Sequence, residues 1–168
     1  MAKKIRIDLN DPRSAVEEIE MFIRSIEDNA DELCMRLALE AQDEAEEKFG
    51  NARPDLNPTT VSNPIKIPNG YKIQATGIKS TAKDGTQGNS VVFAEFGSGT
   101  YASSHPLASE YGAFPGLWSM HDAQQFSSKG RWYYEDERFE YIMPSKAMYH
   151  AALKARMSVI PIAKEVFG

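Results

Sequence analysis

Three histidines and one cysteine are the residues of this chain best suited to metal binding or to nucleophilic and acid–base catalysis. His105 and His121 lie in residues 101–130, and His150 lies near the C-terminus. Their spacing matches no metal-binding motif, and Cys34 has no second cysteine with which to share a metal. We therefore predict that the protein is not an enzyme and holds neither a metal nor a cofactor.

The segment SVVFAEFGSGT, residues 90–100, is the most distinctive local pattern. Its apolar side chains fall on both faces, which predicts a central β-strand over residues 90–96. Gly97 and Gly99 permit a positive φ, and the Glu95 carboxylate could accept hydrogen bonds from amides of the turn that follows. The alternative leaves Glu95 in water at the end of the strand. The Gly-Ser-Gly sequence is neither a nucleophile elbow nor a P-loop.

Residues 101–130 contain prolines, aromatic residues and two histidines but show no regular period. A connection this long in a compact domain is usually functional or disordered, and its aromatic content argues against disorder. We expect the loop to fold over its own sheet or over a neighbouring subunit. A histidine site in this loop would instead make the protein a small hydrolase or nuclease, which is the alternative from a different functional class.

The first long element that the sequence predicts along the chain is a helix. Ser14 and Glu17 form a capping box, which predicts a helix over residues 14–49 with apolar residues every three or four positions. At about 1.5 Å per residue the helix would be roughly 50 Å long, more than the core of a small domain requires. We expect part of its apolar stripe to meet a partner chain, although its first half could equally pack across its own sheet.

A second helix is predicted over residues 145–167, with Ser145 as its cap and Pro161 kinking or restarting it. Between the helices, a hairpin is predicted with its turn at Pro68-Asn69-Gly70, because Asn-Gly readily adopts left-handed angles. Further predictions are a second hairpin (131–134 with 139–143), a linker (51–63), a loop (79–89) and an N-terminal arm or edge strand (1–13).

This order of elements predicts one α+β domain over residues 1–168, with a mostly antiparallel sheet and both long helices packed on one side. The net charge of −5 is unevenly distributed. Residues 14–50 carry twelve Asp and Glu against three Lys and Arg, whereas residues 145–168 carry four basic residues and one acidic residue. The acidic block would repel a phosphate backbone, so we expect no specific nucleic-acid binding. We also expect that the protein does not associate with a membrane and that it is synthesised in a reducing cytoplasm.

Four segments together resemble a known family. They are FAEFGSGT (93–100), GAFPGLWS (112–119), KGRWYY (129–134) and MPSKAMYHA (143–151), and they follow a long acidic helix. In this order and spacing they look like the tail-completion, or neck, proteins of long-tailed bacteriophages, in the branch found in phages and prophages of Gram-positive bacteria. The chain departs from that family at residues 147–149, where Ala-Met-Tyr replaces a more usual Pro-Phe pair.

The resemblance implies a structural virion protein of the head–tail junction. It would complete the tail or join it to the head connector, as a homo-oligomeric ring, for example a hexamer, with DNA passing through the lumen. Its partners would be connector, tail-terminator or tail-tube proteins. A host-directed binding module or toxin carried by a prophage is a further alternative. The candidate assembly residues are Glu95, Phe96, Gly97, Thr100, Trp118, Trp132, Tyr133, Met148 and Tyr149.

Overall fold

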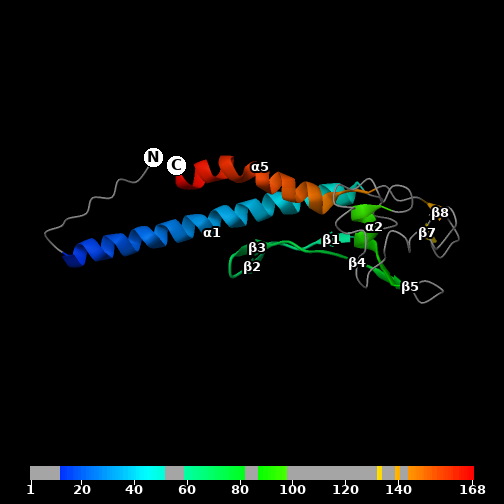
Figure 1. The fold of residues 1–168 in the computed structure, drawn as a ribbon, viewed down its shortest axis with the longest axis horizontal. Helices are drawn as coiled ribbons and strands as arrows, with labels where there is room; N and C mark the ends of the chain where they lie inside the picture. Colours follow the sequence, from blue (N-terminus) through cyan, green and yellow to red (C-terminus); the bar gives the residue numbers. More distant parts are fainter. Residues whose placement is uncertain (1–11, 52–58, 82–86, 98–131, 134–138, 141–143) are drawn as a thin grey trace.

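The computed structural model describes residues 12–51, 59–81, 87–97, 132–133, 139–140 and 144–168. Within these residues, a long N-terminal helix, short antiparallel strand pairs and a C-terminal helix form an α+β fold, as predicted. Figure 1 shows three layers, with the C-terminal helix on one side of the N-terminal helix and a strand ribbon on the other. None of the described helices is long and apolar enough to span a membrane.

The first helix, α1, covers Pro12–Gly50 and contains 39 residues, which makes it roughly 58 Å long. It begins before the predicted capping box, so Ser14 lies inside the helix and is not its cap. Pro12 explains the earlier start, because the fixed φ of proline suits the first helical position and its missing N–H is not needed there. Arg13 is therefore helical, while residues 1–11 of the predicted arm lie outside the described residues.

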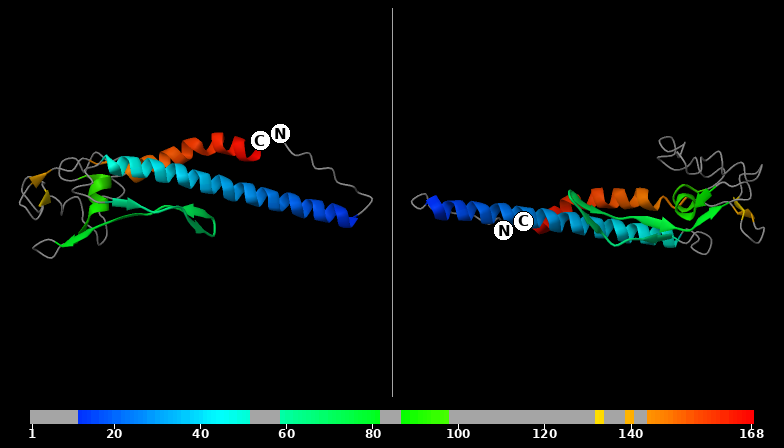
Figure 2. Two further views of the ribbon diagram at one scale, coloured as in Figure 1. Left: turned by 180° about the vertical axis from the view of Figure 1, so that it is seen from behind. Right: turned by 90° about the horizontal axis from the view of Figure 1, so that it is seen from below.

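The last helix, α5 (Ala147–Phe167), runs antiparallel to the C-terminal half of α1 (Figures 1 and 2). Their contact is made largely of small side chains. Ala41 and Ala45 of α1 and Ala147 and Ala151 of α5 are all buried, and Phe49 closes the end of this core. Alanine lets the two helix backbones approach closely, and the loss of water from these methyl groups stabilises the pair.

Pro161 lies inside α5, which continues through it and does not restart. The proline removes one backbone donor from the helix, and α5 is visibly arched in Figure 1.

A long two-stranded ribbon lies against the opposite side of α1. It pairs β1 with β4 and β2 with β3, both antiparallel, and the amide of Ser62 donates to the carbonyl of Gln74 (2.9 Å) between the two pairs. The strands are β1 (Thr59–Val61), β2 (Ile65–Ile67), β3 (Gly70–Lys72) and β4 (Ala75–Gly77). β1 falls within the predicted linker 51–63. The sequence did not predict this strand, because the apolar pattern of Thr-Thr-Val is too short to indicate one.

The turn of this ribbon is in the predicted place but has a different backbone. Ile67 pairs with Gly70, so Pro68 and Asn69 form the loop between β2 and β3. Gly70 has a φ of 132°, whereas Asn69 does not have a positive φ. Pro68 accounts for the difference, because its fixed negative φ suits the second position of an ordinary β-turn, with Gly favoured at the fourth.

Two further strand pairs complete the described structure. β5 (Lys79–Thr81) pairs with β6 (Gln87–Asn89), so the predicted loop 79–89 is wrong at both ends. These strands are polar and lack the apolar alternation by which strands are usually found. β7 (Trp132–Tyr133) pairs with β8 (Phe139–Glu140), which confirms the second hairpin where it is described.

The predicted central strand is a helix, α2 (Ser90–Phe96). Asn89 begins it by accepting a hydrogen bond from the Val91 amide (3.0 Å), and Ser90 bonds to the backbone of Ile78 through both its amide and its hydroxyl (2.9 Å each). A short apolar run fits a buried strand or a buried helix equally well, so these local contacts decide between them.

We predict that Ala151→Leu lowers the free energy of unfolding by about 1–3 kcal/mol, because the added carbons have no room between α1 and α5. Ala151 is 1% exposed. The adjacent Ala152 is exposed, so Ala152→Leu is the matched control and should change stability by less than about 0.5 kcal/mol. Urea unfolding followed by circular dichroism measures both. Equal effects of the two substitutions would contradict the packing described here.

Candidate assembly surface

The Glu95 carboxylate lies at the N-terminus of α5 and is only 6% exposed. One carboxylate oxygen, Oε2, accepts a hydrogen bond from the Met148 amide (2.8 Å), and Oε1 accepts one from the Tyr149 amide (3.1 Å). The first amides of a helix have no partner within the helix and carry a partial positive charge. A carboxylate in this position therefore satisfies two donors and interacts favourably with the helix dipole.

The neighbouring amides of α5 are also paired. Ser145 Oγ accepts from the Ala147 amide (3.3 Å), and the Lys146 carbonyl accepts from the His150 amide (2.8 Å). Ser145 thus contributes one bond, but the prediction that it is the helix cap is wrong. Lys146 holds that position with left-handed backbone angles (φ 55°, ψ 32°) and makes no side-chain capping bond. The distant Glu95 side chain does the work that a local cap residue usually does.

The end of α2 is bonded to the same segment. The amides of Ser145 and Lys146 donate to the carbonyls of Ala94 (2.7 Å) and Glu95 (3.1 Å). We call this set of contacts between the end of α2 and the start of α5 the Glu95 junction. The amides that Glu95 binds lie 53 and 54 positions later in the chain, whereas we predicted the turn directly after it, whose residues from 98 onward lie outside the described residues.

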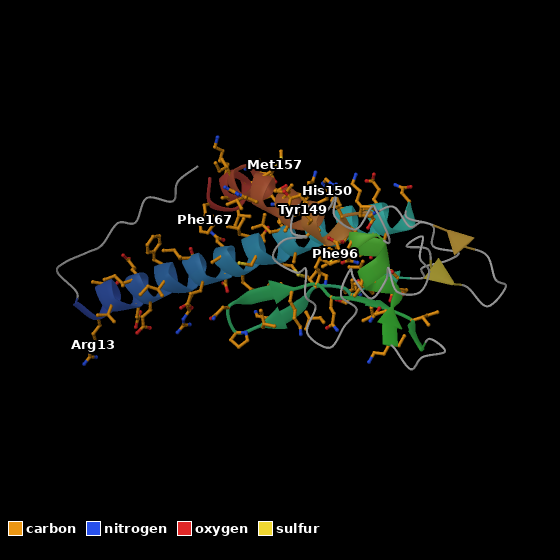
Figure 3. All side chains as sticks on the ribbon, turned by 45° about the vertical axis from the view of Figure 1, so that its right-hand side comes forward. Arg13, Phe96, Tyr149, His150, Met157 and Phe167 are labelled. Atoms are coloured by element: carbon orange, nitrogen blue, oxygen red, sulfur yellow. The ribbon has the colours of Figure 1, made fainter. Side chains whose placement is uncertain are left out.

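The junction brings together five of the predicted assembly residues, Glu95, Phe96, Gly97, Met148 and Tyr149. Figure 3 labels Phe96 and Tyr149, which come from the ends of α2 and α5 that meet here. Gly97 is buried and has a φ of 77°, which explains the need for glycine. Trp132 and Tyr133 form β7, and Thr100 and Trp118 lie outside the described residues.

Two apolar surfaces are exposed away from the junction. Val16, Ile19, Ile23 and Ile26 form what we call the α1 stripe, on the half of α1 that extends beyond α5. Within the described residues no strand covers these side chains, so the alternative prediction, in which this half packs across its own sheet, is not supported there. The second surface, the α5 stripe, consists of Leu153, Met157 and Ile160. We did not predict it, although its i, i+4, i+7 spacing is visible in the sequence.

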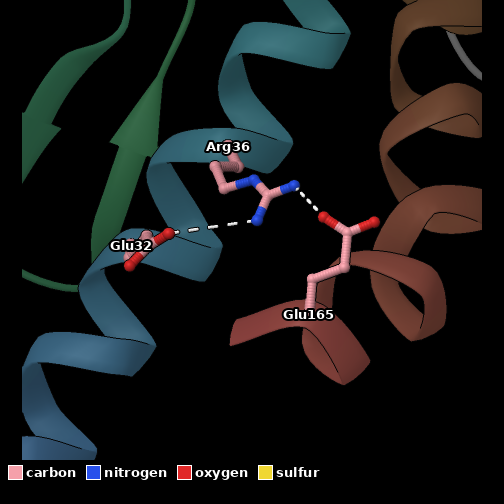
Figure 4. A network of polar contacts seen from close by, with 3 residues as sticks. All are labelled: Glu32, Arg36 and Glu165. Atoms are coloured by element: carbon pink, nitrogen blue, oxygen red, sulfur yellow. Dashed lines mark hydrogen bonds and ion pairs between the residues drawn. The ribbon is translucent and has the colours of Figure 1, made fainter. Parts of the chain in front are cut away.

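Ion pairs reinforce the packing of α5 on α1. Arg36 of α1 donates to the Glu165 carboxylate of α5 and lies 3.9 Å from Glu32 (Figure 4). The hydrogen bond to Glu165 raises the pKa of Arg36. Lys154 of α5 approaches Glu40 of α1 to 3.4 Å in the same way. Acidic α1 and basic α5 therefore attract one another within the chain.

Asp31 holds the tip of the ribbon against α1. Its carboxylate accepts a hydrogen bond from the Tyr71 hydroxyl (2.9 Å) and pairs with the Lys66 ammonium (2.9 Å). The hydrogen bond with Lys66 has the largest effect on the pKa of Asp31, and both contacts lower it. The same hydrogen bonds raise the pKa values of Lys66 and Tyr71. The Lys66 ammonium also lies 5.8 Å from the centre of the Tyr71 ring, within the range of a cation–π contact.

Among the described residues, no cluster of three or more His, Cys, Asp or Glu side chains could hold a metal ion. His150 lies in the first turns of α5 with its ring edge-on to Tyr149, at 5.7 Å between ring centres. His105 and His121 lie outside the described residues. The contacts of the described part therefore position helices and strands, and the exposed groups that it offers to a partner are apolar stripes and charges.

Comparisons with protein-family models, curated proteins and solved structures found no significant match to this chain.

We expect Glu95→Ala to lower the free energy of unfolding by about 2 kcal/mol, because two amides of α5 would lose their acceptor in a buried place. Glu47→Ala, which removes an exposed glutamate of α1, is the control and should change stability by less than about 0.5 kcal/mol. Chemical unfolding at neutral pH measures both variants. If they were equally stable, the Glu95 junction would not hold α5 in place.

The pH dependence of ribbon docking should follow Asp31. Because its pKa is lowered on folding, its contribution is fully present above the ordinary aspartate value of 3.8 and is lost as the pH falls through the lower folded value. The stability difference between the wild type and Asp31→Asn should therefore be constant near neutral pH and shrink in strong acid. Unfolding curves across pH measure this, with Asp43→Asn as the control on the same helix. A difference that grows on acidification would contradict the assignment.

Proposed function

We propose that this chain is a structural protein of phage assembly that acts at the head–tail junction, where it completes the tail or joins it to the head connector. The observation that carries the proposal is the α1 stripe. It lies on a helix that extends well beyond the rest of the described structure, as Arg13 and Phe167 mark in Figure 3. A long amphipathic helix with its apolar side in water is typical of a subunit that is completed by an assembly.

The sequence resemblance supports the same proposal. Two of the segments that carry it, residues 93–100 and 143–151, contribute the two sides of the Glu95 junction. They are far apart in the sequence, yet the carboxylate of one binds the helix amides of the other. This gives the pattern a physical reason, since changing either segment alone would leave a buried carboxylate or helix amides without partners.

In the proposed assembly the protein forms a homo-oligomeric ring with connector, tail-terminator or tail-tube proteins as its neighbours. The acidic residues of α1 suit a channel through which DNA passes, because like charges keep the phosphate backbone from adhering. DNA would then pass through the channel without being bound as a specific ligand. The protein would be located in the virion, at the junction or the tail end.

Deletion of the gene from its phage or prophage tests this proposal, with electron microscopy of the lysate as the measurement. We expect filled heads beside unjoined or aberrant tails, and rescue by the wild-type gene supplied in trans. In complemented particles, a tag on the protein should be found at the head–tail junction. As the control, deletion of a gene that is dispensable for particle assembly should leave joined particles.

Intact infectious particles in the deletion lysate would overturn the proposal. A lysate that lacks heads and tails altogether would point to an earlier role, such as that of an enzyme acting before assembly.

A further inference from the structure

The two exposed apolar stripes lie on different helices and carry opposite charges around them. The α1 stripe belongs to residues 12–30, which contain five Asp and Glu against two Arg. The α5 stripe belongs to a helix with three Lys and Arg against one Glu. Each stripe is a row of large side chains with substantial exposure, including Ile23 at 49% and Met157 at 77%.

The α5 stripe lies on the side of α5 opposite to α1. Ala147, Ala151 and Ile162 form the buried side, and positions two residues apart on a helix point in nearly opposite directions. Leu153 and Met157 therefore face away from α1, and Figure 3 shows Met157 on the outer side of α5. The helix is apolar on both sides, but only one of them is covered within the described structure.

The α1 stripe continues the surface that α5 already covers. Its residues recur at spacings of three and four that lead, through Ala30 and Leu37, to the buried Ala41 and Ala45. The cover ends where Arg36 meets Glu165, close to the C-terminus of α5. The uncovered half thus presents the same kind of face, apolar with acidic edges, that binds a basic helix in the other half.

We propose that the α1 stripe of one copy packs against the α5 stripe of a second copy, so that copies associate head to tail. The inference names the contact surface of the homo-oligomer in the proposed function and rests on that oligomer. Pairing α1 with α5 places acidic residues beside basic ones and buries both apolar rows together. The pairs α1–α1 and α5–α5 would each bring like charges together.

A contact of this kind uses two different surfaces of each copy. Every copy that binds through its α1 stripe still has a free α5 stripe, so association continues until a ring closes or the supply of copies ends.

Two variants test the inference, each with one stripe blocked. Ile19→Glu with Ile23→Glu blocks the α1 stripe. Met157→Glu with Ile160→Glu blocks the α5 stripe. All four positions are exposed and glutamate is a good helix former, so both variants should keep the circular dichroism spectrum of the wild type.

Sedimentation velocity over a range of concentrations, together with amine–carboxylate cross-linking to capture weak complexes, measures association. We expect the wild type to self-associate and each variant alone to be a monomer. An equal mixture of the two variants should form dimers of one copy of each and nothing larger, because only one intact pair of stripes remains. Added salt should weaken the dimer.

Any other pattern of association among the wild type, the two variants and their mixture overturns the inference. Self-association of the variant blocked on α5 would mean that α1 stripes pair with each other. Self-association of the variant blocked on α1 would mean that α5 stripes pair with each other. A wild type that stays monomeric and gives no cross-links would mean that the stripes bind a different protein. If the mixture of variants forms no dimer while the gene deletion still gives unjoined heads and tails, only this contact is wrong. If the mixture succeeds and the deletion leaves infectious particles, the phage role is wrong.

Discussion

The Glu95 carboxylate, buried at the start of α5, is the interaction on which the rest of the described structure depends. Burying a carboxylate is costly unless it is paired or hydrogen-bonded, and here two helix amides donate hydrogen bonds to it. Through α2 the same residue is connected to the ribbon, because Ser90 bonds to Ile78 at the end of β4. Through α5 it is connected to α1. The Glu95 side chain therefore joins α2 to the helix pair, and Ser90 joins α2 to the ribbon.

The helix pair depends on small side chains, and this limits what α5 can do elsewhere. Ala45, Ala147 and Ala151 let α1 and α5 approach closely, and ion pairs along the edge fix how far α5 extends along α1. Because alanine buries little area per residue, the contact must run over several turns to contribute much stability. Leu153, Met157 and Ile160 of α5 lie on its outer side, where the described structure does not cover them.

The molecule is consequently divided into a packed end and an extended one. At the packed end, α1 has α5 on one side and the ribbon on the other (Figure 1). The tip of the ribbon contacts α1 at Asp31. Beyond it, α1 continues with apolar side chains in water, and such a helix gains most of its stability from packing. This asymmetry is the structural basis of the proposed role in an assembly: the packed end makes a stable subunit, and the extended end has surface left for a partner.

The sequence by itself determined the elements with a long or strongly marked period: both long helices, the ribbon turn near Gly70, the hairpin of Trp132 and the α+β class. It also indicated that α1 is longer than its own core requires. The tertiary structure decided that residues 90–96 form a helix, that the polar residues 79–81 and 87–89 form paired strands and that Glu95 binds amides more than fifty positions away. The physical reason is the same in each case. Local periodicity reports which face of an element is buried, whereas hydrogen-bond partners brought together by folding determine what a short segment becomes.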